Sequence, residues 1–134
     1  MFHDALAAIA LAFGTLIGLG SLINPNWAAG VVRLVEDPDK PGGFAEFRAT
    51  YGGLLMMLHL TGLIALFMLP PAMGLAAILP IAAGWAGAGF GRMFSLIFDG
   101  KRLREPALNP IWIATELILA IAIAAPAFRL IGQA

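Results

Sequence analysis

Four long apolar stretches, separated by short segments, determine what this chain can fold into. They cover residues 5–23, 49–69, 72–98 and 111–131. About 20 apolar residues in a helix cross the hydrocarbon core of a bilayer, because each residue adds about 1.5 Å. Charged side chains make up only 12% of the chain, against about 25% in soluble domains. The sequence therefore predicts an all-α polytopic membrane protein, a four-transmembrane-helix bundle forming a single domain over residues 1–134.

The connections predict how the spans follow one another. Pro70 and Pro71 alone separate the second and third stretches, which therefore form an antiparallel hairpin. The connection over residues 24–48 opens with Asn24-Pro25-Asn26-Trp27, and Asn109-Pro110-Ile111-Trp112 repeats the pattern before the fourth stretch. Asn favours the N-cap, Pro the first helical position and Trp the membrane interface. We predict a short interfacial helix in the first connection and the start of span four at the second string.

The first stretch has two interpretations, a cleaved signal peptide or a retained span. A signal peptide has a basic segment before an apolar core of about 7–15 residues. Here His3 and Asp4 precede the stretch, and the apolar run is longer than such a core. We therefore interpret it as the first transmembrane span.

Lysine and arginine collect beside the first and third connections. The residues on that side are Arg33, Lys40, Arg48, Arg92, Lys101, Arg102 and Arg104. Only Arg129 belongs to the opposite side. Because positively charged loops stay in the cytoplasm, we expect the first and third connections to be cytoplasmic and both termini to lie outside.

Arg92 and Glu116 are single charges inside otherwise apolar spans. A charge at hydrocarbon depth costs about 2.5 kcal/mol or more, so it usually has a partner. Arg92 lies six residues before Phe98, where span three ends, and Glu116 lies six residues after Pro110, near which span four begins, so both are at a depth of about 9 Å from the same surface. We predict that they pair, although separate snorkelling of both side chains to the headgroups is the alternative.

A second polar line follows the second span. Arg48, Gly52, Leu55 and His59 have helical spacing and share a face, with Tyr51 beside them. Arg48 is expected at the surface and His59 near the bilayer centre. Two interpretations of His59 remain open, a neutral side chain bonded to a hydroxyl or carbonyl, and a ligand or proton site.

Glycines at a spacing of four predict close helix packing on two spans. Gly14 and Gly18 form a GxxxG motif on the first span, and Gly87 and Gly91 form another on the third. Such motifs let helix backbones approach each other. The contacts are expected either within the bundle or across a homodimer or a larger membrane complex.

The remaining composition excludes several classes of function. The chain has no cysteine and two histidines, so we expect no metal site and no cofactor. Its formal net charge is zero, with no basic arm that would bind nucleic acid. The polar residues also form no recognisable catalytic arrangement.

Phe47-Arg48-Ala49-Thr50-Tyr51-Gly52-Gly53 opens span two, Gly91-Arg92-Met93-Phe94-Ser95 followed by Asp99-Gly100 closes span three, and Glu116 lies in span four. These residues resemble a family of small bacterial four-helix membrane proteins of unknown function, which is distantly similar to the DoxX-like proteins. More loosely, the chain is similar to emopamil-binding protein and the sigma-2 receptor. The resemblance implies a multi-pass protein of the bacterial cytoplasmic membrane. It also implies a polar cluster at the cytoplasmic end, built from Arg48, Tyr51, Arg92 and Glu116, but no reaction.

Three hypotheses for function follow. The preferred one is a protein that binds or moves a lipid-like or quinone-like molecule. Its predicted ligand-binding residues are Arg48, Tyr51, His59, Arg92 and Glu116. The second hypothesis is an accessory or assembly subunit of a membrane complex. The third, an intramembrane enzyme with Glu116 and His59 as acid and base, requires these groups to meet although their predicted depths differ.

Overall fold

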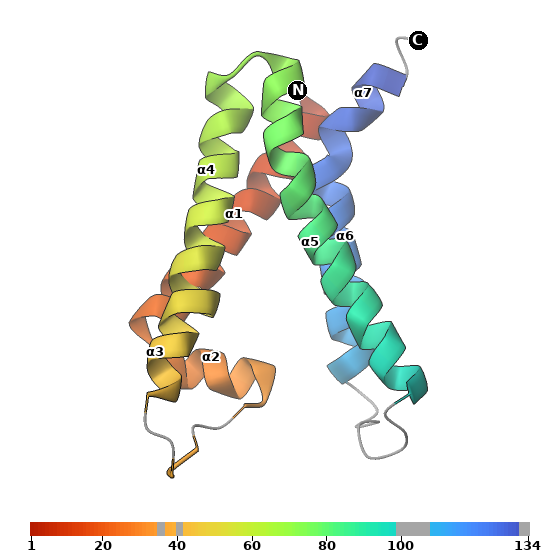
Figure 1. The fold of residues 1–134 in the computed structure, drawn as a ribbon. Helices are drawn as coiled ribbons and strands as arrows, with labels where there is room; N and C mark the ends of the chain where they lie inside the picture. Colours follow the sequence, from red (N-terminus) through yellow and green to blue (C-terminus); the bar gives the residue numbers. More distant parts are fainter. Residues whose placement is uncertain (35–36, 40–41, 99–107, 132–134) are drawn as a thin grey trace. The chain divides into compact units, whose positions relative to one another are not determined.

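The regular structure of the described residues is entirely helical, with four helices long and apolar enough to cross a membrane (Figure 1). The computed structural model describes residues 1–34, 37–39, 42–98 and 108–131. The four candidate spans are Phe2–Ile23, Gly43–Met68, Pro71–Phe98 and Pro110–Ala127. The prediction of an all-α membrane protein with four spanning helices is therefore confirmed.

The chain divides into two compact units. The first unit contains Met1–Ala10 and Ala65–Ala134, and the second contains Leu11–Ile64. The predicted single domain stays a prediction, and each unit is described by itself below.

From Leu11 onward, α1 (Phe2–Ile23) belongs to the second unit, where the short helix α2 (Pro25–Val32) follows it. The Asn24 side chain accepts a hydrogen bond from the Trp27 N–H at 3.1 Å, and Pro25 occupies the first turn. The helix ends where Arg33 adopts a left-handed conformation with φ of 59°. The short helix thus begins where the sequence predicts; its place in a membrane interface stays a prediction.

A small apolar core joins α2 to α3 (Gly43–Phe47). Ala28 and Ala29 pack against Phe47, with Val32 and Phe44 at the edge of the cluster. The chain then continues without a break through the π-helix η1 (Arg48–Leu54) into α4 (Leu55–Met68). The second long helix therefore begins at Gly43, six residues before the predicted limit, because this core extends it beyond the apolar stretch.

Close packing of α1 against η1 and α4 depends on glycine. A Cβ at Gly14 would overlap the His59 ring, and one at Gly18 would overlap the Met56 backbone. At Gly52 a Cβ would lie 2.9 Å from Leu22 Cα. The first GxxxG motif therefore packs within the chain, which was one of its two predicted roles.

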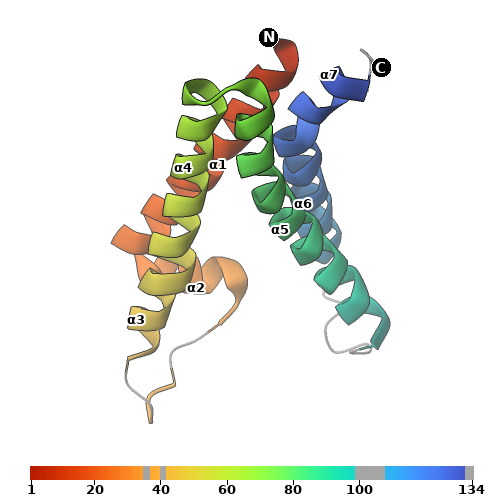
Figure 2. The same cartoon turned by 45° about the horizontal axis from the view of Figure 1, so that its top comes forward.

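In the first unit, α5 (Pro71–Phe98) and α6 (Leu108–Ala124) lie side by side (Figures 1 and 2). Gly74 faces the Ala65 carbonyl, where a Cβ would lie 2.9 Å from the oxygen, so the chain reverses tightly at Pro70 as predicted. Gly89 packs in the same way against Leu117 of α6. The buried apolar residues of this unit include Ala7, Ala10, Leu75, Ile78, Ala82, Leu119, Ala120 and Ile123.

The fourth span is interrupted before its predicted end. Helix α6 gives way to a single 3-10 turn, η3 (Ala125–Ala127), and then to α7 (Phe128–Ile131). Pro126 lies in this 3-10 turn. It explains the interruption of the helix, because a proline ring has no N–H to donate and clashes with the preceding helical turn. At its other end α6 begins at Leu108, two residues before Pro110.

Candidate functional site

The predicted site residues divide between the two units. Arg48, Tyr51 and His59 belong to the second unit, and Arg92 and Glu116 belong to the first. The single cluster of these residues implied by the family resemblance therefore stays a prediction.

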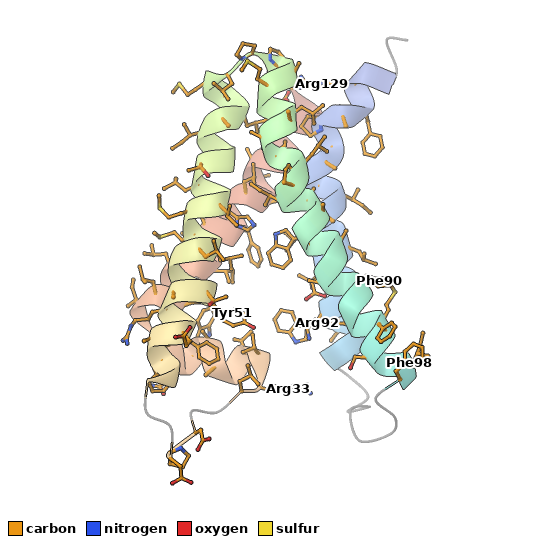
Figure 3. The ribbon with its side chains drawn as sticks, viewed as in Figure 1. Arg33, Tyr51, Phe90, Arg92, Phe98 and Arg129 are labelled. Atoms are coloured by element: carbon orange, nitrogen blue, oxygen red, sulfur yellow. The ribbon has the colours of Figure 1, made fainter. Side chains whose placement is uncertain are left out.

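In the first unit, Arg92 of α5 and Glu116 of α6 form an ion pair. The Arg92 Nε–H donates a hydrogen bond to Glu116 Oε1 at 2.7 Å. Gly89, one turn before Arg92, brings the helices together, since a Cβ there would lie 3.1 Å from Leu117 and 3.6 Å from the Glu116 Cβ. The predicted pairing is thus confirmed. In Figure 3, Arg92 is labelled on the C-terminal half of α5, between Phe90 and Phe98 in the sequence.

The pair contains the only charged side chains of α5 and α6, and its two members are unequally buried. No other Asp, Glu, Lys or Arg occurs in the sequence of α5 or α6. The Glu116 side chain is 5% exposed, whereas the Arg92 side chain is 37% exposed. A carboxylate is thus held inside the helix pair by a guanidinium whose far edge reaches the surface of the unit.

The pair leaves hydrogen-bonding capacity unused on both sides. Glu116 Oε2 is fully buried and has no hydrogen-bond partner among the described residues. Within the same ranges, the Arg92 guanidinium makes a single hydrogen bond, from Nε. Because arginine carries five N–H donors, the four on its Nη atoms are free of described protein acceptors. Polar atoms that lack a hydrogen-bond partner are rare in an apolar environment, because an unmade hydrogen bond there costs free energy.

Arg48 and Tyr51 make contacts that organise the second unit. The Arg48 Nε–H donates to the Leu22 carbonyl at 3.2 Å, which satisfies an acceptor in the last turn of α1. The Tyr51 ring stacks on Phe47 with centroids 5.2 Å apart. These contacts give both residues a structural role in joining η1 to its neighbours.

His59 is buried in the second unit, beside Gly14 of α1. Its Nδ1 lies 2.7 Å from the Leu55 carbonyl of its own helix. This contact agrees with the interpretation of a histidine bonded to a carbonyl; a ligand or proton role stays a prediction.

Two features of the polar structure were not predicted from the sequence. The segment Arg48–Leu54 is a π-helix, although its face was assigned from α-helical spacing. Arg48, Gly52 and His59 nevertheless all contact α1, so the shared face is correct while the helix type was wrong. The only local signal for the wider turn is the Gly52-Gly53 pair, and π-helical turns are often found at functional sites.

The second unpredicted feature is an ion pair between α7 and α1. Arg129 Nη1 and Nη2 donate to the two carboxylate oxygens of Asp4 at 2.8 and 2.6 Å, which ties α7 to the first turn of α1. The sequence contained a signal for it, because both termini were expected on the same side and carry opposite charges.

No family model, curated protein or solved structure matches this chain. The resemblance to the DoxX-like proteins therefore stays a prediction. Among the described residues, no group of three or more His, Asp or Glu side chains is placed to hold a metal ion.

Proposed function

We propose that this membrane protein binds or moves a lipid-like or quinone-like molecule whose polar head is held by Arg92 and Glu116. The observation that carries the proposal is the single hydrogen bond of the pair. An arginine and a carboxylate that only join two helices commonly form two parallel bonds, which use both oxygens. Here one oxygen and both terminal nitrogens remain for another molecule.

The membrane supplies the reason why that molecule is needed. Few waters compensate an unpaired polar group at hydrocarbon depth, where each unsatisfied group costs several kcal/mol. Arg92 and Glu116 each lie six residues inside a candidate span, counted from Phe98 and Pro110. A head group brought by an apolar molecule would complete these hydrogen bonds, while its apolar body lies against the surrounding spans.

The orientation of the protein is part of the proposal. The excess of Lys and Arg beside the first and third connections supports a cytoplasmic location for these connections, in a bacterial cytoplasmic membrane. Of the residues that give this excess, Lys40, Lys101, Arg102 and Arg104 lie outside the described residues. In this orientation Arg92 and Glu116 hold the head group near the cytoplasmic surface, with Arg48 and Tyr51 proposed at the same end.

Arg129 offers a matched control for testing Arg92. Both arginines are 37% exposed and both pair with a carboxylate, but the partner of Arg92 lies in the middle of α6, whereas Arg129 joins α7 to α1. Native mass spectrometry of protein extracted in mild detergent would compare the Arg92→Ala and Arg129→Ala variants. We expect Arg92→Ala to lose most of the co-purified amphiphile and Arg129→Ala to keep it. Equal retention in the two variants would contradict the proposal.

A subunit role is the second candidate, and the open face of α5 favours it. Gly84, Gly87 and Gly91 follow one helix face, and a Cβ at any of them would meet no described atom within 4 Å. We propose a second copy of this chain as the occupant, because GxxxG faces pair with their own kind in membranes. Replacing Gly87 and Gly91 with Ile should convert a dimer to a monomer in light scattering. A native protein that is already monomeric would exclude this dimer, and a pull-down in mild detergent that returned only this protein, at the size of a single chain, would contradict a subunit role.

A further inference from the structure

The buried oxygen of Glu116 restricts which head groups fit the pair. We propose that the ligand's head carries an N–H or O–H donor directly beside a hydrogen-bond acceptor and has no net charge. This inference rests on the proposed function, because it concerns the same site.

The unused hydrogen-bonding atoms of the pair indicate that the head group has both a donor and an acceptor. Glu116 Oε2 is a carboxylate oxygen, which accepts and does not donate, and it lacks a donor among the described residues. The Arg92 Nη atoms donate and cannot accept. A head that offers only acceptors, such as a ketone or a fully substituted phosphate ester, would satisfy Arg92 and leave Glu116 Oε2 unpaired. Only a head with a donor next to an acceptor satisfies both residues.

The net charge of the pair indicates that the head group is uncharged or zwitterionic. Arg92 and Glu116 sum to zero, and α5 and α6 carry no other Asp, Glu, Lys or Arg. Among the described residues of this unit, the other ion pair between side chains is Asp4 with Arg129, thirteen residues beyond Glu116 along the chain. An anionic head would therefore leave a net negative charge at hydrocarbon depth, where it is strongly disfavoured. A neutral or zwitterionic head leaves the site uncharged.

The buried oxygen must turn to meet a head group. The terminal torsion of a glutamate side chain is broad, so the carboxylate can turn about its last bond. The proposed complex needs a turn that leaves one oxygen on the Arg92 Nε–H and presents the other beside the partly exposed guanidinium, where the head would lie.

Two kinds of membrane molecule have this chemistry. A phosphatidylethanolamine head places an ammonium beside a phosphate, and a quinol with methoxy substituents places hydroxyls beside the methoxy oxygens. Each of these molecules has a close analogue that lacks the hydrogen-bond donor. Phosphatidylcholine keeps the phosphate and the zwitterion but has no N–H, and the oxidised quinone keeps its acceptors but has no O–H.

The test measures binding of these four probes to the full-length protein in detergent, with identical acyl chains in the two lipids and identical tails in the quinol and quinone. In the native protein we expect one donor-bearing probe to bind about tenfold more tightly than its partner, the difference of one charge-assisted hydrogen bond. A preference within the lipid pair identifies a phospholipid ligand, and a preference within the other pair identifies a quinol. In Glu116→Gln, where an amide N–H₂ replaces the acceptor Oε2, the preference should fall to about twofold or less.

The outcomes separate this inference from the proposed function. If Arg92→Ala weakens probe binding but the native protein does not distinguish either pair, the inference is wrong and the proposed function stands. A preference that persists unchanged in Glu116→Gln also overturns the inference. If Arg92→Ala binds every probe as the native protein does, the proposed function itself fails. The comparison within the native protein needs no variant, so a folding defect in Glu116→Gln would not prevent a decision.

Discussion

Arg92 and Glu116 meet across α5 and α6 through one hydrogen bond of 2.7 Å, between Nε and Oε1. The carboxylate is almost fully buried and the guanidinium is partly exposed. This geometry joins the two helices and still leaves one acceptor and several donors for a third group. The pair therefore has both a structural and a binding consequence, and the two can be measured separately.

The structural consequence is an energetic coupling between the two side chains. Single Arg92→Met and Glu116→Gln variants and the double variant, unfolded in detergent by a denaturant, form a double-mutant cycle. We expect a coupling of roughly 1–2 kcal/mol, because the bond joins charged groups and one of them is partly exposed. A coupling near zero would mean that the two charges contribute independently.

The same cycle on Asp4 and Arg129 should give a smaller value. Both side chains of that pair are partly exposed, at 22% and 37%, and it lies at the end of the last helix. We expect a coupling below about 1 kcal/mol that decreases at high salt. A salt-independent coupling larger than that of Arg92 and Glu116 would be inconsistent with this description.

The two GxxxG motifs should differ in their tolerance of large side chains. Gly18 lies against the Met56 backbone, whereas Gly87 has open space around its Cβ position. Gly18→Leu should lower the free energy of unfolding by about 2 kcal/mol or more, because a backbone cannot move aside as a side chain can. Gly87→Leu, the matched control, should change the free energy of unfolding of the monomeric protein by about 0.5 kcal/mol or less, because no described atom of the same chain lies near its Cβ position. Equal effects at the two glycines would count against the packing of α1 on α4.

The short helix α2 should depend on its N-cap. Asn24→Ala removes the acceptor of the Trp27 N–H and should destabilise α2 by about 1 kcal/mol. Hydrogen exchange of the α2 amides would then be about fivefold faster. Asn26→Ala, which removes an exposed amide two residues further on, is the control and should leave exchange unchanged. Similar acceleration in both variants would show that the cap does not hold this helix.

Much of the fold could be predicted because a membrane imposes simple rules. Hydropathy and length located the four long helices, and Pro70-Pro71 located the reversal between two of them. The pairing of Arg92 with Glu116 followed from their equal depths and from the cost of an isolated charge. These inferences needed only local composition and the thickness of a bilayer.

The features that sequence analysis missed depend on tertiary contacts. The π-helix at Arg48–Leu54 accompanies the approach of Gly52 to Leu22, and nothing in a spacing of four residues distinguishes it from an α-helix. The sequence also did not show which GxxxG motif packs inside the chain, because both have the same pattern. The pair of Asp4 and Arg129 depends on the turn at Pro126, which sets the direction of α7.

The most direct test of the binding site is to capture its ligand without assuming its identity. Trp112 lies one turn before Glu116 on α6, so a photoreactive phenylalanine analogue in its place would be near the head group. The same analogue in place of Phe67, which is 63% exposed on α4, would sample surrounding lipid. We predict one dominant adduct mass at position 112, absent at position 67 and lost when Arg92→Ala is added. The same mixture of adducts at both positions, unchanged by Arg92→Ala, would contradict a binding role for Arg92 and Glu116.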